Sequence, residues 1–372
     1  MIDSKPPAFT NLNDYAKEDV GAKVLFATDD FFAICDNMLL NTEPVFLADK
    51  YTEYGKYMDG WETRRKRVAG HDWCIIRLAT ICSIKGLLID TAFFVGNYAP
   101  KYSIQAAVLK PEDEALIPKR NASFGTGATA DDFKQIQKLR TDTWEEIVPL
   151  TVLQPGNEET RRNYQKVLSD EAWTHIRINI FPDGGIARLS VFGDAMPPVP
   201  PPDQLIDLIS MLNGGKLLGF SNGQFSSPKN LIKPEKSLSM ADGWETARRL
   251  DRPKVITTYD NGTITSPGNE YAVFKLGFTG RVKKICADTT QFKGNYPDTI
   301  RFEGVNLGNK EWEDSQDIPW KTILGPVKLS ANREHWFDCD SDTINHVRVI
   351  IAPDGGMSRV RMYGFVESNQ IM

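Results

Sequence analysis

One stretch of the chain concentrates side chains that transfer protons or bind anions. Carboxyl and imidazole groups act as general acids and bases, and arginine holds a carboxylate through two parallel hydrogen bonds. The stretch contains Asp59, Glu62, the four cations from Arg64 to Arg67, and the adjacent pair His71 and Asp72. These residue types, on a segment that reads as strand ends and loops, favour a site for a small anion with a proton-transfer group beside it.

Several common catalytic motifs are absent. The chain has no G-x-G-x-x-G, no G-x-x-x-x-G-K-[ST] and no H-E-x-x-H pattern, which disfavours dinucleotide, phosphate-loop and helical zinc-protease chemistry. The segment Gly219–Gly223 matches the G-x-S-x-G nucleophile pattern, but that motif requires a helix after the serine. Here Gln224–Pro228 follows, so a serine hydrolase is disfavoured.

Composition excludes several classes of partner. The 372 residues carry a formal net charge of -5, which disfavours binding to nucleic acid or to an anionic membrane. The first residues lack an apolar signal stretch, and no run approaches the ~18 apolar residues of a membrane span. We therefore expect a cytoplasmic protein with no membrane partner.

The cysteines and histidines do not form a recognisable metal site. The five cysteines are scattered without a C-x-x-C pair, a pattern that favours reduced thiols. We therefore predict no metal site and no required cofactor. The sequence does not exclude the use of a divalent metal ion.

Self-comparison shows that the chain is an internal repeat. Asp59-Gly60-Trp61-Glu62-Thr63 returns unchanged as Asp242-Gly243-Trp244-Glu245-Thr246, and later blocks match in the same order. Gly96-Asn97-Tyr98 matches Gly294-Asn295-Tyr296, and Pro182–Gly185 matches Pro353–Gly356. The order holds while the spacing drifts, which indicates two copies of one domain with loops of different length.

The proline-rich segment Met196–Pro202 separates the copies. The predicted organisation is an N-terminal arm over residues 1–23, a first repeat over 24–193, a proline-rich linker with a short amphipathic helix over 194–215, and a second repeat over 216–366.

The repeats read as mainly β. His175–Ile180 alternates apolar and polar side chains, Pro182–Gly185 is expected to be a hairpin turn whose Asp183 caps its own backbone, and Ala187–Val191 alternates again. Many short strands between Gly and Pro turns predict β-sandwiches. Helix is expected only in inserts such as Asp131–Leu139.

Several segments together resemble the allantoicase family. They are Phe26–Phe32, Met58–Arg65, Gly70–Trp73, Asp90-Thr91 with Gly96–Tyr98, and Phe181–Arg188. The resemblance covers nearly the whole chain and implies two tandem jelly-roll, galactose-binding-like β-sandwich domains. It also implies a homo-oligomeric hydrolase of C–N bonds in linear amidines, which converts allantoate to ureidoglycolate and urea in allantoin and purine catabolism.

The chain departs from the family pattern at two points, one in the second copy and one in both copies. The Asp72-Trp73 pair of the first copy is replaced by Glu270-Tyr271, and a histidine common in the family is Phe93 in one copy and Gln291 in the other. These departures keep an alternative open, namely a weak or inactive homologue that binds a small ureido ligand.

Allantoate carries a carboxylate and two ureido groups on one carbon, so its site needs a cation, acceptors for N–H groups and an acid. Repeat one concentrates such groups, and we take Glu62, His71, Asp72 and Asp59 as the catalytic candidates. The substrate-binding candidates are Arg64, Arg65, Asp90, Asn97, Tyr98 and Arg188. The competing interpretations are structural: a buried tryptophan in Asp-Gly-Trp-Glu-Thr, a solvated loop for the cation run, and a strand role for Arg188.

Overall fold

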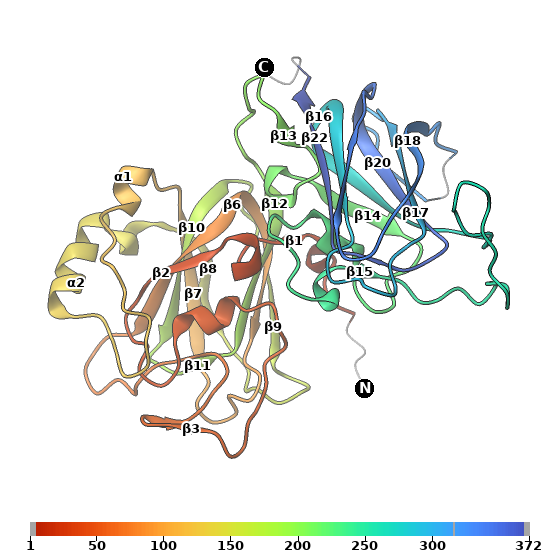
Figure 1. Cartoon of the computed structure of the whole chain (residues 1–372). Coiled ribbons are helices and arrows are strands. Elements are labelled where there is room, and N and C mark those ends of the chain that lie inside the picture. Colours follow the sequence, from red (N-terminus) through yellow and green to blue (C-terminus); the bar gives the residue numbers. More distant parts are fainter. Residues whose placement is uncertain (1–4, 315–316, 368–372) are drawn as a thin grey trace. The chain divides into compact units, whose positions relative to one another are not determined.

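The computed structural model describes residues 5–314 and 317–367. The chain divides into two compact units, Met1–Met196 and Pro197–Met372, which we call unit 1 and unit 2 (Figure 1). Both are mainly β, and each is built around an eight-stranded antiparallel arrangement with the same order of strands. The fold expected from the alternating sequence pattern is confirmed.

In unit 1 the strand order is β1-β12-β6-β10-β7-β8, with β2 and β9 also pairing with β6. Small two-stranded ladders join β5 to β11 and β3 to β4. The strands are β1 (Asn13–Asp14), β2 (Lys23–Ala27), β3 (Tyr51–Thr52), β4 (Gly55–Lys56), β5 (Trp61–Glu62), β6 (Asp72–Asp90), β7 (Lys101–Ala107), β8 (Glu145–Val152), β9 (Arg162–Lys166), β10 (Ala172–Phe181), β11 (Gly185–Ile186) and β12 (Arg188–Ala195).

Unit 2 repeats this order as β13-β22-β16-β20-β17-β18, with β14 and β19 on β16 and with β15 paired to β21. Its strands are β13 (Ile206–Asp207), β14 (Lys216–Phe220), β15 (Trp244–Glu245), β16 (Glu270–Asp288), β17 (Thr299–Val305), β18 (Lys321–Lys328), β19 (Glu334–Asp338), β20 (Thr343–Ala352), β21 (Gly356–Met357) and β22 (Arg359–Val366).

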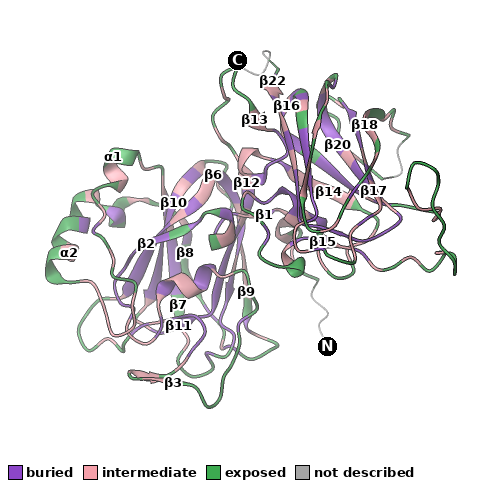
Figure 2. Cartoon of the chain, viewed as in Figure 1, coloured by how far each residue is buried: buried purple, intermediate pink, exposed green. Residues whose placement is uncertain are grey.

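The 19-residue strand β6 organises unit 1. Its first residues pair with β10 and β2, and its last residues pair with β12 and β9, so one strand serves both halves of the sandwich. The strands of both units are largely buried and the connecting loops are largely exposed (Figure 2). This burial of apolar strand faces is what makes the alternating sequence fold as a sandwich.

The two α-helices found in the described part of unit 1 lie in the insert between β7 and β8 (Figure 1). They are α1 (Pro111–Glu114) and α2 (Ala130–Ile136). Thr129 caps α2 through a reciprocal capping box with Asp132, and Ile136 packs in one cluster with Phe26 and Trp73. The helix predicted in this insert is confirmed.

The amphipathic helix predicted in the linker is wrong. Ile206–Asp207 forms strand β13, which pairs with β22, and the only helical turn there is the 3-10 turn Met211–Asn213. The Asp207 side chain accepts from the backbone N–H of Met362 at 2.8 Å. The backbone N–H of Leu208 donates to the Met362 carbonyl oxygen at 2.8 Å, so the segment satisfies its backbone by pairing with a strand. Leu208 and Ile209 are buried all the same. Strand β1 pairs with β12 in the same way in unit 1, so the N-terminal arm also contributes a strand.

Candidate functional site

A cavity of about 450 Å³ lies among the loops at one end of unit 1. We call it site 1. Its walls come from β5, from the loop between β6 and β7, and from the turn between β10 and β11. The lining residues are Phe32, Glu62, Thr63, Arg65, Lys66, Gly96, Asn97, Tyr98, Pro100, Pro182, Asp183 and Gly184.

Trp61 fixes the wall that carries Glu62. Its ring is completely buried, and its Nε1 donates to the carbonyl oxygen of Asp29 at 2.7 Å. Strand β5 pairs with β11, which places Glu62 opposite Gly185. Because successive strand residues point to opposite sides, burying Trp61 turns Glu62 toward the cavity. The motif therefore serves the fold through its tryptophan and the site through its glutamate.

Glu62 and Asn97 form a hydrogen-bonded pair in the wall of site 1. Asn97 Nδ2 donates to Glu62 Oε1 at 2.7 Å. Burial raises the pKa of the Glu62 carboxyl above its ordinary value, and the Asn97 bond opposes this effect only in part. A carboxyl with a raised pKa keeps its proton at higher pH, which suits a general acid.

Two cations differ in their availability. Lys66 Nζ pairs with the fully buried Asp72 at 2.6 Å, and Asp72 also accepts from the Thr28 hydroxyl at 2.7 Å. Arg65 is exposed and forms no ion pair with any residue that the structure describes. Arg65 can therefore bind a substrate carboxylate, whereas Asp72 holds Lys66 in place.

Asp183 links the turn to the cation segment. Its Oδ2 accepts from the backbone N–H of Lys66 at 2.8 Å, whereas we expected it to cap its own turn. The turn itself is present between β10 and β11, and Gly184 adopts a φ of 131° there, a conformation that favours glycine. The Thr63 hydroxyl accepts from the Gly184 N–H at 3.1 Å, which ties β5 to the same turn.

The predicted site residues Asp59, Asp90 and Arg188 lie outside the lining of site 1 and form ion pairs. Arg188 and Asp59 are both buried and pair at 2.9 Å. Asp90 pairs with Arg161 at 3.1 Å and accepts from the backbone N–H of Ala92 at 2.8 Å. These contacts join β12 and β6 to neighbouring loops and give Asp59, Asp90 and Arg188 a structural role.

Arg64 and His71 also lie outside site 1. Arg64 pairs with Asp29 at 2.6 Å and lines a different cavity of about 470 Å³ beneath the helical insert. His71 Nε2 lies 3.1 Å from Asn179 Oδ1, and its ring packs against Phe181. Burial lowers the pKa of His71, which favours its neutral form.

Of the ten predicted site residues, Glu62, Arg65, Asn97 and Tyr98 line one cavity. Thr63, Lys66 and Asp183 line it too and were not predicted as site residues. The signal that could have found Thr63 and Asp183 was their recurrence in the second copy as Thr246 and Asp354.

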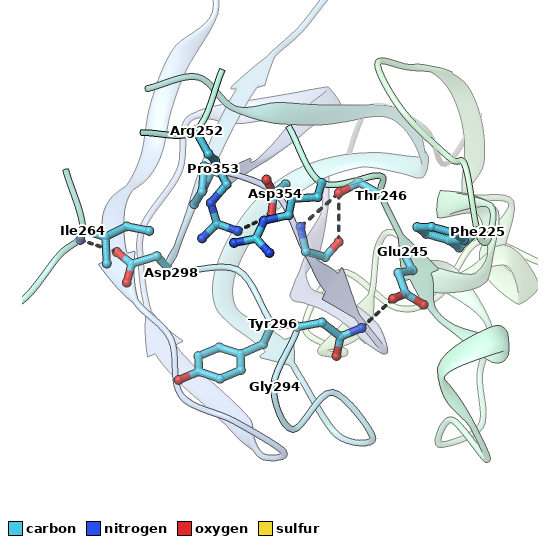
Figure 3. A pocket seen from close by; sticks show the side chains of 13 residues that line it. Phe225, Glu245, Thr246, Arg252, Ile264, Gly294, Tyr296, Asp298, Pro353 and Asp354 are labelled. Atoms are coloured by element: carbon cyan, nitrogen blue, oxygen red, sulfur yellow. Dashed lines mark hydrogen bonds and ion pairs between the residues drawn. The ribbon is translucent and has the colours of Figure 1, made fainter. Parts of the chain in front are cut away.

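Unit 2 contains the same cavity, about 440 Å³ in volume, which we call site 2 (Figure 3). Asn295 Nδ2 donates to Glu245 Oε1 at 2.5 Å, and Asp354 accepts from the backbone of Arg249 at 2.8 Å. The lining residues are Phe225, Glu245, Thr246, Arg248, Arg252, Ile264, Gly294, Asn295, Tyr296, Asp298, Pro353, Asp354 and Gly355.

The departure at Glu270 preserves the local contacts. Glu270 pairs with Arg249 at 3.2 Å and accepts from the Ser221 hydroxyl at 2.5 Å, as Asp72 does with Lys66 and Thr28. The longer acid is thus accompanied by a change of its cation, and the frame of the site is kept in unit 2.

Within residues 5–314 and 317–367, no group of three or more His, Cys, Asp or Glu side chains is arranged to hold a metal ion. Nor is any helix of that part of the chain long and apolar enough to cross a membrane.

Comparison with known proteins matches two copies of the family model "Allantoicase repeat", over residues 13–196 and 206–367. A "Probable allantoicase" of Acinetobacter baumannii strain AYE is 36% identical over 366 residues, which cover 96% of this chain and 95% of that protein. Its counterpart in Acinetobacter baylyi is 34% identical over 97% of this chain. A crystal structure of allantoicase from Saccharomyces cerevisiae superposes with a TM-score of 0.70 at 30% identity, covering 95% of this chain and 93% of that one.

The fold and the two cavities define a tandem-repeat β-sandwich protein whose sites each offer an acid, an amide and a guanidinium with no ion-pair partner among the described residues. The family match spans both repeats and nearly the whole chain. The chain belongs to the allantoicase family.

Proposed function

We propose that this chain hydrolyses allantoate to ureidoglycolate and urea, and that site 1 is a catalytic site for this reaction. The observation that carries the proposal is that the hydrogen-bonded pair Glu62–Asn97 lines one cavity together with Arg65, which has no ion-pair partner within residues 5–314 and 317–367. Family membership supplies the reaction, and the cavity supplies the groups that the reaction needs.

Each group of site 1 has a part in substrate binding. Arg65 holds the carboxylate of allantoate by a bidentate contact. Asn97, Tyr98 and Asp183 hydrogen-bond the ureido groups. Lys66, held by Asp72, keeps the turn at Asp183 in place.

Glu62 transfers the proton. In its protonated form it gives a proton to one ureido nitrogen as the bond from the central carbon to that nitrogen breaks, and urea leaves with the electron pair. The lone pair of the remaining ureido nitrogen stabilises the electron-poor carbon. Water then adds to this carbon and returns a proton to the Glu62 carboxylate, so that the group is ready for another turnover.

The test is to incubate the purified chain with allantoate and to follow urea by a coupled assay and ureidoglycolate by ¹H NMR. We expect both products in equal amounts. Absence of urea release at enzyme concentrations comparable to the substrate contradicts the proposal. Allantoate binding without turnover then supports the alternative of an inactive homologue.

Cofactor use and assembly are separate proposals. We propose that turnover requires no metal, so dialysis against a chelator leaves the rate of urea release unchanged; a loss that is restored by one divalent cation overturns this. We also propose a homo-oligomer, for which light scattering coupled to gel filtration gives the mass in solution. A mass equal to one chain overturns that proposal.

A further inference from the structure

We propose that site 2 is a second catalytic centre for the same reaction, so that each chain carries two. This inference rests on the proposed function of site 1. It assigns an activity to the cavity of unit 2, with a small ureido-carboxylate as substrate.

The reacting pair of site 1 is present in site 2. Glu245 accepts from Asn295 at 2.5 Å, and Thr246 accepts from the Gly355 N–H at 3.0 Å (Figure 3). Strand β15 pairs with β21 so that Glu245 lies opposite Gly356, which reproduces the pairing of Glu62 with Gly185. The acid and the amide therefore meet in the same place relative to their strands.

The cation that binds the carboxylate is also kept, although its neighbours are not. Arg64 is replaced by Ala247, Lys66 by Arg249 and Arg67 by Leu250, while Arg65 returns as Arg248. Arg248 is exposed, lines site 2, and forms no ion pair with any residue that the structure describes.

The arginines that the fold requires are buried and ion-paired, unlike Arg65 and Arg248. Arg188 and Arg359 occupy equivalent positions, are buried, and pair with Asp59 at 2.9 Å and with Asp242 at 2.7 Å. Arg65 and Arg248 have no such partner among the described residues, so packing gives no reason for their identity. Binding of an anion in both cavities explains why an arginine stands at both positions.

The two cavities differ in some of the charged residues that line them. Site 2 has Asp298 where site 1 has Pro100, and it adds Arg252, whose Nη1 lies 3.3 Å from Asp354 Oδ1. Asp298 is held by the backbone N–H of Ile264 at 3.0 Å and by an ion pair with Lys328. Arg252 and Asp298 add charges to the lining of site 2, so we expect the two centres to have different KM values.

The experiment compares wild type, Glu62→Gln, Glu245→Gln and the double variant in urea release per chain from allantoate. Glutamine keeps the acceptor for Asn97 or Asn295 but cannot transfer the proton. We expect each single variant to keep the rate of the other centre and the double variant to lose at least about 100-fold. Glu311→Gln, an exposed residue outside both cavities, is the matched control and keeps the wild-type rate.

The outcomes separate the two proposals. If Glu62→Gln alone is as inactive as the double variant, site 2 is not catalytic and this inference fails, while the proposed function stands. If wild type releases no urea, both fail. Arg248→Gln is a second variant in case Glu245→Gln disturbs folding, because an exposed side chain without an ion-pair partner among the described residues contributes little to stability. We expect Arg248→Gln to lower the rate of urea release by a Glu62→Gln chain at least tenfold. An unchanged rate overturns the inference.

Discussion

The raised pKa of Glu62 links its burial to the pH dependence of the reaction. The general acid must be protonated, so kcat/KM falls as pH rises through the pKa of Glu62. In a chain whose site 2 is disabled by Glu245→Gln, we expect this fall to report Glu62 alone. The measurement is a pH–rate profile for urea release. A flat profile between pH 4 and 8 contradicts the role of Glu62 as the acid.

The same burial affects stability. A carboxyl whose pKa is raised in the folded state binds more protons there than in the unfolded chain, so its contribution to stability falls as pH rises between its unfolded and folded pKa values. Glu62→Gln removes that penalty. We expect the variant to gain melting temperature relative to wild type at pH 7 and to lose this gain at pH 4. An equal difference at both pH values contradicts the prediction.

Arg64 and Asp29 form a pair that unit 2 lacks entirely, since Ala247 and Asn222 stand in their places. Asn222 keeps the hydrogen bond to the backbone of residue 247 at 3.1 Å, as Asp29 does with Arg64 at 3.2 Å. Arg64→Ala leaves a carboxylate that is 7% exposed without its cation, at a cost of about 1–3 kcal/mol.

We therefore expect Arg64→Ala to be less stable than the double variant Asp29→Asn with Arg64→Ala. Denaturant unfolding of wild type and the three variants gives the coupling between the two positions. Equal stability of Arg64→Ala and the double variant contradicts this account. Burial raises the pKa of Asp29. Because a protonated Asp29 does not need a cation, we expect the stability cost of Arg64→Ala to decrease at low pH.

Sequence reasoning identified the residue types of site 1 and only part of its membership. Glu62, Asn97 and Tyr98 line the cavity, whereas Asp59, Asp90 and Arg188 neutralise buried charges nearby. A buried ion pair and a catalytic carboxylate use the same side chains. Which role applies depends on the direction in which a turn points each side chain, and spacing along the chain does not contain that information.

At the scale of elements, the short ladder of β5 with β11 is what positions the acid. Gly60 precedes this ladder, and a Cβ there would lie 2.5 Å from the carbonyl oxygen of Ile186 and 2.7 Å from Ala187 Cα. Backbone atoms cannot move aside at low cost, so we expect Gly60→Ala to lower stability by about 1–3 kcal/mol and to lower kcat by displacing Glu62.

Gly96 is the matched control, because a Cβ there meets nothing within 4 Å. Thermal unfolding of both variants checks the prediction. We expect Gly96→Ala to have the melting temperature of the wild type. A Gly60→Ala protein of wild-type stability contradicts the assigned role of the ladder.

Period-two patterns predicted the long strands because one face of each is buried. The linker helix failed for a related reason. Leu208 and Ile209 are both buried in the turn that follows β13, so their apolar character did not indicate a helix. Pairing with a strand distant in sequence decided the conformation.

At the scale of the whole chain, each unit contains its own core and its own cavity. We expect cleavage at a protease site inserted within Pro197–Pro202 to leave two fragments that each unfold cooperatively. Calorimetry of the cleaved and intact chains measures this. Loss of a cooperative transition in either fragment contradicts the independence of the two units.

The duplicated acid–amide pair also has a genetic consequence. With a complete set of reacting groups in each copy, a substitution that inactivates one centre is masked by the other, and a cell that depends on this chain keeps part of its flux. A screen for loss of allantoate use would therefore seldom return changes at Glu62 or Glu245. It would instead be enriched in changes that prevent the whole chain from accumulating and so remove both centres at once.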